Sequence, residues 1–115
     1  MRRVVVALLL ALLASAPTVA SDDDATIEAL LVAVGESACT FIRNGKEYSS
    51  TDAEDHLRMK YRRGKQWATD AETFIERIAS KSSFSGKPYR IRCGNGAAEL
   101  TSDWLAARLT EIESR

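Results

Sequence analysis

An apolar run at the N-terminus limits the compartment and the type of fold that the rest of this chain can have. Arg2 and Arg3 precede an unbroken apolar stretch, residues 4–14, and a small-residue triplet ends at Ala20. This pattern is typical of a secretory signal peptide and predicts cleavage after Ala20. The stretch is about half the roughly 20 residues that cross a bilayer, and nothing later is apolar for long enough. We therefore expect export to a bacterial periplasm, no membrane span after cleavage, and one small domain over residues 21–115.

The charge of that domain argues against nucleic acid as a partner. The full chain has 16 basic and 16 acidic side chains, and cleavage removes Arg2 and Arg3. Proteins that bind phosphate backbones usually carry a basic surplus, which this domain lacks overall. Because so short a domain buries only a modest core, a covalent crosslink would add usefully to its stability.

The hydrophobic pattern alternates between helical and strand periods. A helical spacing of apolar residues covers residues 27–34, behind a run of acidic residues that suits a helix N-terminus. Asn44-Gly45 separates two short strand-like stretches, residues 40–43 and 46–48, and predicts a hairpin, because a type I′ turn needs positive φ at both central positions. Residues 89–93 alternate as a third strand, and a last amphipathic helix starts at Thr101 or Ser102.

Two more helices are predicted by the tetrapeptide Thr-Asp-Ala-Glu, which occurs at residues 51–54 and again at 69–72. We interpret each copy as a capping box, in which the threonine hydroxyl and the glutamate carboxylate satisfy free backbone N–H groups. Together the patterns predict an α+β fold, a single domain with about four helices packed on a small, mostly antiparallel three-stranded sheet.

Two cysteines occur, Cys39 before the hairpin and Cys93 at the end of the third strand. In an exported chain this pair predicts a Cys39–Cys93 disulfide. Closing the loop of about 55 residues between the two cysteines would stabilise the fold by about 4 kcal/mol in the chain-entropy model. A redox-active pair would more usually be spaced two residues apart, so we favour a structural role over a catalytic one.

His56 and Lys60 interrupt an otherwise apolar helix face. Alignment of the two capped helices puts them where the second helix has Phe74 and Ile78. One interpretation is a boundary histidine that Asp52, one turn earlier, keeps protonated. The other is the wall of a basic cleft, since the stretch HLRMKYRRGK, which includes Arg58, is the only dense cationic run.

The stretch ASKSSFSGKPY combines hydroxyl groups, cations and a glycine. Its members Ser82, Ser83, Ser85 and Lys87 suit an anion cradle. The loop follows a helix C-terminus and matches no phosphate-binding motif, so a solvated loop is the favoured interpretation. Trp67 and Trp104 are expected at the rim of the core.

Three ordered motifs, FIRNGKEY, HLRMKY and FIERIASKSSFSGKPY, resemble an uncharacterised family of small exported Gram-negative proteins, a domain of unknown function. The resemblance covers about residues 27–109. It implies a single periplasmic domain with no assigned activity. Its cysteine pair is not uniform in the family, which implies that the disulfide is not the shared function. The recurrent polar positions of the family fall here on Arg43, Asn44, Gly45, His56, Arg58, Lys60, Ser82, Ser83, Ser85, Gly86, Lys87 and Tyr89.

The first functional hypothesis is a non-enzymatic binding or interaction domain for an unknown acidic periplasmic protein or an anionic small molecule, with no cofactor. Its candidate binding residues are Arg43, His56, Arg58, Lys60, Ser82, Ser83, Ser85, Lys87 and Tyr89. No catalytic residues and no metal site are expected, since one histidine with no oriented nucleophile supports neither.

Two alternatives remain. Residues 85–89 resemble the SGxxY loop of periplasmic lysozyme inhibitors, which are β-rich, whereas this chain is mostly helical. The second alternative is a small hydrolase in which His56 acts with Ser83 or Ser85.

Overall fold

The computed structural model describes residues 20–115 of the chain. The predicted signal peptide lies outside these residues except for Ala20. None of the helices in the described part is long and apolar enough to cross a membrane. The elements are α1 (Ala20–Glu36), β1 (Thr40–Arg43), β2 (Lys46–Tyr48), α2 (Ser50–Gly64), a short 3-10 helix η1 (Lys65–Trp67), α3 (Ala71–Arg77), β3 (Arg90–Arg92), β4 (Glu99–Leu100) and α4 (Thr101–Glu113).

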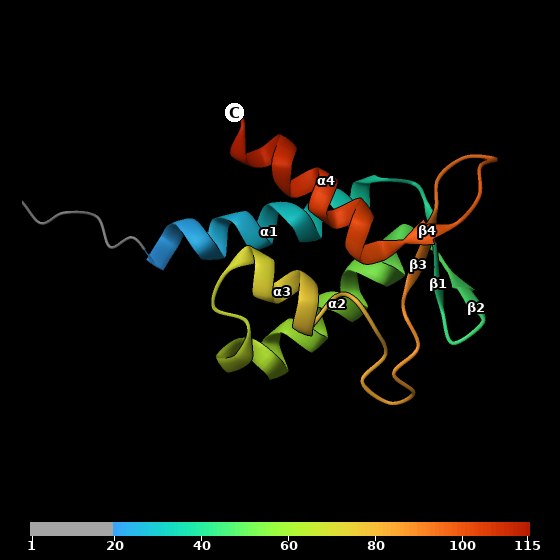
Figure 1. The fold of residues 1–115 in the computed structure, drawn as a ribbon, viewed down its shortest axis with the longest axis horizontal. Helices are drawn as coiled ribbons and strands as arrows, with labels where there is room; N and C mark the ends of the chain where they lie inside the picture. Colours follow the sequence, from blue (N-terminus) through green and yellow to red (C-terminus); the bar gives the residue numbers. More distant parts are fainter. Residues whose placement is uncertain (1–19) are drawn as a thin grey trace, which may run out of the picture.

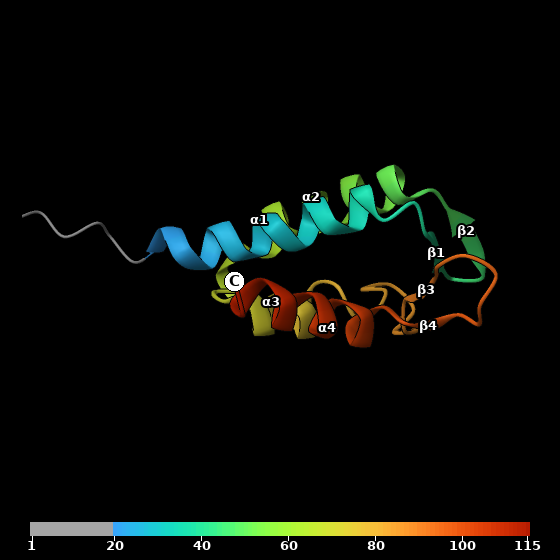
Figure 2. The same ribbon diagram turned by 90° about the horizontal axis from the view of Figure 1, so that it is seen from above.

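The four α-helices form two layers. α1 and α2 lie side by side in one layer, and α3 and α4 form the other, with the sheet at one end of the molecule (Figures 1 and 2). The apolar face predicted for α1 is buried between the layers, where Ile27 and Leu30 are fully enclosed. Phe74 of α3 and Leu105 of α4 meet it from the opposite layer, so one core joins all four helices.

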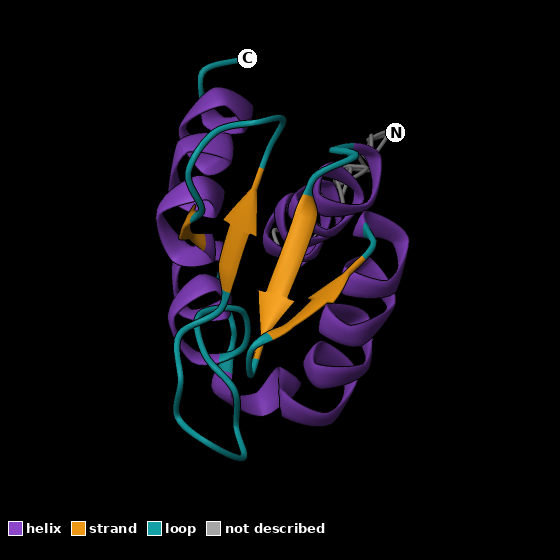
Figure 3. Cartoon of the chain, turned by 90° about the vertical axis from the view of Figure 1, so that its right-hand side faces the viewer, coloured by secondary structure: helices purple, strands orange, loops and turns teal. Residues whose placement is uncertain are grey.

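The sheet has four strands in the order β2-β1-β3-β4, and every pairing is antiparallel (Figure 3). The prediction of an α+β single domain is confirmed, and the prediction of three strands is wrong. The strand that was missed is β4, which pairs Glu99 with Ile91 and Leu100 with Arg90. Two residues are too few to show a period of two, so only the neighbouring strand defines this one.

The hairpin and the disulfide agree with the sequence. Asn44 and Gly45 have φ values of 51° and 77° and join β1 to β2. Cys39 and Cys93 are bonded to each other just beyond the ends of β1 and β3, which are paired neighbours. The hairpin and the disulfide together hold β1 in place. Because β1 ends at Arg43, they also fix the position of the Arg43 backbone.

The helix starts differ from the predicted capping boxes. α2 is capped by Ser49, whose hydroxyl accepts from the Asp52 N–H, and not by a threonine. α3 is capped by Asp70, which accepts from the N–H of Thr73, while the Thr73 hydroxyl accepts from the N–H of Asp70. Both helices therefore carry a cap, but each cap is displaced from the predicted residue, because several neighbouring side chains can do the same capping.

Candidate functional site

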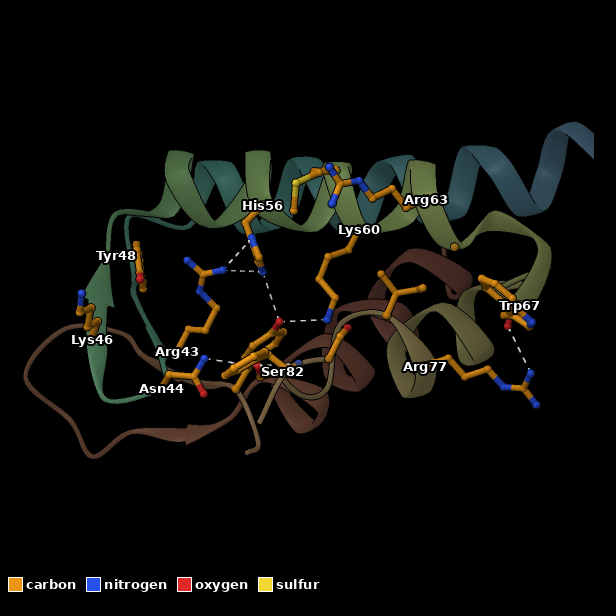
Figure 4. Close-up of a pocket in the computed structure, with 16 residues that line it drawn as sticks. Arg43, Asn44, Lys46, Tyr48, His56, Lys60, Arg63, Trp67, Arg77 and Ser82 are labelled. Carbon is orange, nitrogen blue, oxygen red and sulfur yellow. Dashed lines mark hydrogen bonds between the residues drawn. The ribbon is translucent and has the colours of Figure 1, made fainter. Parts of the chain in front are cut away.

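A groove of about 880 Å³ lies between α2 and the segment that joins α3 to β3 (Figure 4). We call it the basic groove. One face of α2 forms a wall of the groove through His56, Met59, Lys60 and Arg63, which are spaced as a single helical stripe. The remaining lining residues are Arg43, Asn44, Lys46, Tyr48, Gly64, Trp67, Arg77, Ile78, Ser82, Ser83, Phe84 and Tyr89.

A chain of hydrogen bonds crosses the middle of the groove. The Nζ of Lys60 lies 2.9 Å from the hydroxyl of Tyr89, and that hydroxyl lies 3.2 Å from Nε2 of His56. Nη1 of the Arg43 guanidinium lies 2.9 Å from each of the two ring nitrogens of His56. Because a guanidinium can only donate, one imidazole nitrogen must be unprotonated to accept from it. His56 is therefore held in its neutral form.

The charge states of the groove agree with this geometry. The pKa of His56 falls from 6.5 to about 4, first because burial disfavours the imidazolium and then because Arg43 and Lys60 repel it. The pKa of Lys60 falls from 10.5 to about 8, through burial and then repulsion by Arg43. Burial raises the pKa of Tyr89 against the opposing effect of Arg43. Near neutral pH the centre thus holds two cations and two neutral groups.

The charged lining of the groove is entirely basic. Its charged residues are Arg43, Lys46, Lys60, Arg63 and Arg77, and no aspartate or glutamate is among the lining residues. The chain as a whole has as many acidic as basic side chains, so an even mixture would have placed two or three carboxylates here. The arrangement therefore produces a local positive potential in a protein without a basic surplus.

The β1–β2 turn and the serine loop, residues 79–89 between α3 and β3, support one side of the groove. The side chain of Asn44 donates to Ser82 Oγ over 3.3 Å and accepts from the hydroxyl of Ser85. Ser82 is buried, and its hydroxyl also accepts from the N–H groups of Phe84 and Ser85 over 3.2 Å each. These bonds fix the loop and place Ser82 and Ser83 at the edge of the groove.

The predicted site residues separate into two groups. The structure brings together Arg43, His56, Lys60, Ser82, Ser83 and Tyr89 as groove lining. It does not bring Arg58, Ser85 or Lys87 into that lining. Ser85 contacts the groove only indirectly, because its hydroxyl donates to the side chain of Asn44, which is a lining residue. Lys87 is an exposed loop residue whose N–H donates to Ser85.

Arg58 lies on the side of α2 that faces α1. Its guanidinium donates to both carboxylate oxygens of Glu28 at 2.6 and 2.7 Å, and its Nε donates to Glu54 at 2.7 Å. The expected partnership of His56 with Asp52 is also absent, since Asp52 is exposed and the imidazole is bonded to Arg43 and Tyr89. The expectation of a protonated His56 is therefore wrong, because groups distant in sequence surround the ring.

Several lining residues had not been selected from the sequence as site residues. Met59 and Arg63 could have been found, because they lie three and seven positions after His56 on one helix face. Trp67, expected at the core rim, is instead 56 % exposed. Trp67, Phe84 and Arg77 carry no sequence signal that separates them from ordinary surface residues.

The geometry bears on the two alternative functions. In the described residues, the hydrogen bonds of His56 go to Arg43 and Tyr89 and none goes to Ser83 or Ser85, so the geometric support for a Ser–His hydrolase is missing. Tyr89 is 1 % exposed, so its ring is not presented to a protein partner as an inhibitory loop would require. Within residues 20–115 no three His, Cys, Asp or Glu side chains gather as a metal site.

Comparison with known proteins places the chain in a family. Residues 21–113 match the model described as "Family of unknown function (DUF5329)". A relative from Salmonella typhimurium, described as "Uncharacterized protein YfeK", is 43 % identical over 86 residues, which is 74 % of this chain and 71 % of the relative. No solved structure matches. The chain belongs to the DUF5329 family, whose function is unknown.

Proposed function

We propose that this protein is a non-enzymatic periplasmic binding domain that holds an acidic partner or an anionic ligand in the basic groove. The observation that carries the proposal is that Arg43, His56 and Lys60 are joined in one hydrogen-bonded chain, in a groove with no carboxylate in its lining. We call these three residues, with the Tyr89 hydroxyl between them, the anion centre.

The electrostatics of the anion centre favour binding of an anion. Bringing basic groups together out of bulk water costs free energy, which is why the pKa values of His56 and Lys60 are depressed. A carboxylate, sulfate or phosphate placed between them would accept hydrogen bonds from Arg43 and Lys60 and remove the repulsion. The same anion would stabilise the imidazolium, so His56 would gain a proton as the ligand binds.

Two observations support the periplasm as the compartment. The Cys39–Cys93 disulfide is of the kind that persists in oxidising compartments and is rare in the cytosol. The N-terminal sequence has the basic start, apolar stretch and small-residue end of an export signal.

The volume of the groove, about 880 Å³, lies in the range of small-ligand sites, roughly 300–1,000 Å³.

The proposal is tested by NMR titration of His56, the only histidine in the chain. The pKa of its imidazole is measured with and without sodium sulfate, with chloride keeping the ionic strength constant. We expect sulfate to raise this pKa from about 4 by roughly one unit or more.

The matched variants are Arg43→Gln and Arg58→Gln, which remove the same charge from two different surfaces. The sulfate-dependent increase should disappear in Arg43→Gln and in Lys60→Gln and remain in Arg58→Gln, because only Arg58 lies outside the groove. An imidazole pKa that is the same with and without sulfate would contradict the proposal, and so would an equal loss in all three variants.

A further inference from the structure

Lys60 differs from the other lysines of this chain in its surroundings. The chain has five lysines, all in the described residues, and Lys60 is the only one that is not exposed. Its side chain extends from α2 into the basic groove (Figure 4). Its Nζ donates to the backbone carbonyl of Lys81 over 2.8 Å and lies 2.9 Å from the Tyr89 hydroxyl. The amine is therefore held inside the groove, where a small ligand can reach it.

No carboxylate stabilises the charged form of this amine. None of the ion pairs in the described residues includes Lys60, and the lining of the groove contains no aspartate or glutamate. Burial, and then repulsion by Arg43, lower the pKa of Lys60 to about 8. At pH 8 about half of these side chains are neutral, compared with roughly one in 250 for an ordinary exposed lysine. Only the neutral amine has the free electron pair that a nucleophile needs.

The Tyr89 hydroxyl is placed to act as a proton donor beside the amine. It lies 2.9 Å from Nζ of Lys60 and 3.2 Å from Nε2 of His56. The same Nζ lies 4.7 Å from the centroid of the Tyr89 ring. Burial raises the pKa of Tyr89 against the opposing effect of Arg43, so the phenol keeps its proton near neutral pH. A nucleophile, a proton donor and a cation that can hold a carboxylate thus occur together in one groove.

We infer that Lys60 binds oxo acids covalently, by condensing with the aldehyde or ketone group of a small ligand whose carboxylate is held by Arg43. The inference rests on the proposed function, because the carboxylate occupies the anion centre. The amine selects the carbonyl group, since a neutral lysine forms imines with aldehydes and ketones. The guanidinium selects the acid, because it donates charge-assisted hydrogen bonds to a carboxylate.

The condensation balances without any further reactant. The Lys60 nitrogen forms a bond to the carbonyl carbon, and the carbonyl oxygen becomes a hydroxyl group by taking one of the two protons of the amine. The Tyr89 phenol donates its proton to that hydroxyl, which leaves as water, and recovers the remaining proton from the nitrogen. The product is an imine, and nothing is oxidised or reduced. Hydrolysis by the reverse route releases the acid unchanged, so the step is reversible binding and not turnover.

The experiment is reductive trapping with sodium cyanoborohydride, which converts an imine into a stable secondary amine. The bridge of His56 and Tyr89 separates Arg43 from Lys60, so the probe is 4-oxobutanoate, with two methylene groups between its aldehyde and its carboxylate. Butanal, with the same carbon chain and no charge, is the matched control. Mass spectrometry of peptides identifies the labelled residues. The α-amino group of the chain is the internal reference, because its ordinary pKa, about 7.7–8.0, is close to that of Lys60.

The expected result is a preference for Lys60 that depends on the charge of the probe. 4-Oxobutanoate should label Lys60 about tenfold or more in excess over the α-amino group, because a hydrogen bond to a charged group contributes at least that much affinity. Butanal should show no such excess. The four exposed lysines should stay largely unlabelled with both probes, since their amines are protonated at pH 8.

Variants test the two supporting groups. Arg43→Gln should remove the excess seen with 4-oxobutanoate, whereas Arg58→Gln, outside the groove, should retain it. Tyr89→Phe keeps the ring and removes the hydroxyl, so it should slow the labelling of Lys60 by about tenfold or more with both probes and leave labelling of the α-amino group unchanged. An unchanged rate in that variant would refute the role of the phenol as proton donor. The comparison of probes on the wild-type protein depends on no variant.

The outcomes separate this inference from the proposed function. If 4-oxobutanoate labels Lys60 no more than the α-amino group, while sulfate still raises the pKa of His56, covalent binding is refuted and anion binding remains. If butanal labels Lys60 with the same excess as 4-oxobutanoate, the acid is refuted as the ligand class. If neither sulfate nor 4-oxobutanoate changes the NMR signal of His56, the proposed function itself fails.

Discussion

Acid sensitivity between pH 7 and pH 5 should come from one side chain, His56. The pKa of this imidazole is about 4 in the folded protein and about 6.5 in the unfolded chain. Between these values the unfolded state binds a proton that the folded state does not, so the free energy of unfolding must fall as the pH falls through this window. The stabilising effect is complete above pH 6.5 and is lost as the pH approaches 4.

The magnitude follows from the same two values. With the full difference in pKa, the linkage relation gives a loss of about 1.8 kcal/mol between pH 7 and pH 5. His56 is only partly buried, and solvent screens its repulsion from Arg43 and Lys60, so we expect about 1 kcal/mol. Lys60, with a pKa of about 8, loses its proton above this window, and the pKa values of Glu28 and Asp70 are lowered, which moves their protonation further below it.

The assay is urea unfolding followed by tryptophan fluorescence at pH 7 and pH 5, for the wild type and for His56→Gln. Glutamine can still accept from Arg43 but does not titrate. The wild type should lose about 1 kcal/mol at the lower pH, and the variant less than about 0.3 kcal/mol. A wild-type protein equally stable or more stable at pH 5, or a variant with the same loss, would refute the placement of a neutral imidazole beside Arg43.

Three further predictions concern other parts of the molecule. Replacing both Cys39 and Cys93 by alanine should lower the free energy of unfolding by up to about 4 kcal/mol, because the crosslink spans 54 residues; wild-type protein unfolded in a thiol reductant should match it, and unequal values would contradict a purely covalent effect. Arg58→Gln should cost about 0.5–1 kcal/mol at low salt and less at high salt, as its ion pair with Glu28 is partly exposed; a salt-independent cost in urea unfolding would oppose this. Sulfate affinity, measured by calorimetry, should fall as the pH rises through about 8, where Lys60 loses its proton, but not in Lys60→Arg; equal profiles would remove Lys60 from the anion centre.

Features specified by neighbouring residues could be predicted from the sequence. The hairpin depends on two residues that tolerate positive φ, Asn44 and Gly45, and its strands begin and end where the alternating pattern does. The helices follow from apolar spacing, and the disulfide from there being only two cysteines in a chain with an export signal. The sequence also placed His56 and Lys60 on the flank of a buried face, where both lie.

Only the tertiary structure determined what these two residues do there. Within its own helix His56 has Asp52 as the evident partner, which predicts an imidazolium. In the folded protein, burial of the ring and then repulsion by Arg43 and Lys60 lower its pKa and make it neutral. Protonation depends on burial and on all nearby charges, and the tertiary fold both buries the ring and brings up Arg43, which is 13 residues away in the sequence. Strand β4 and the exposure of Trp67 could not be predicted from the sequence for the same reason. Strand pairing and the burial of a side chain both depend on residues distant in the chain.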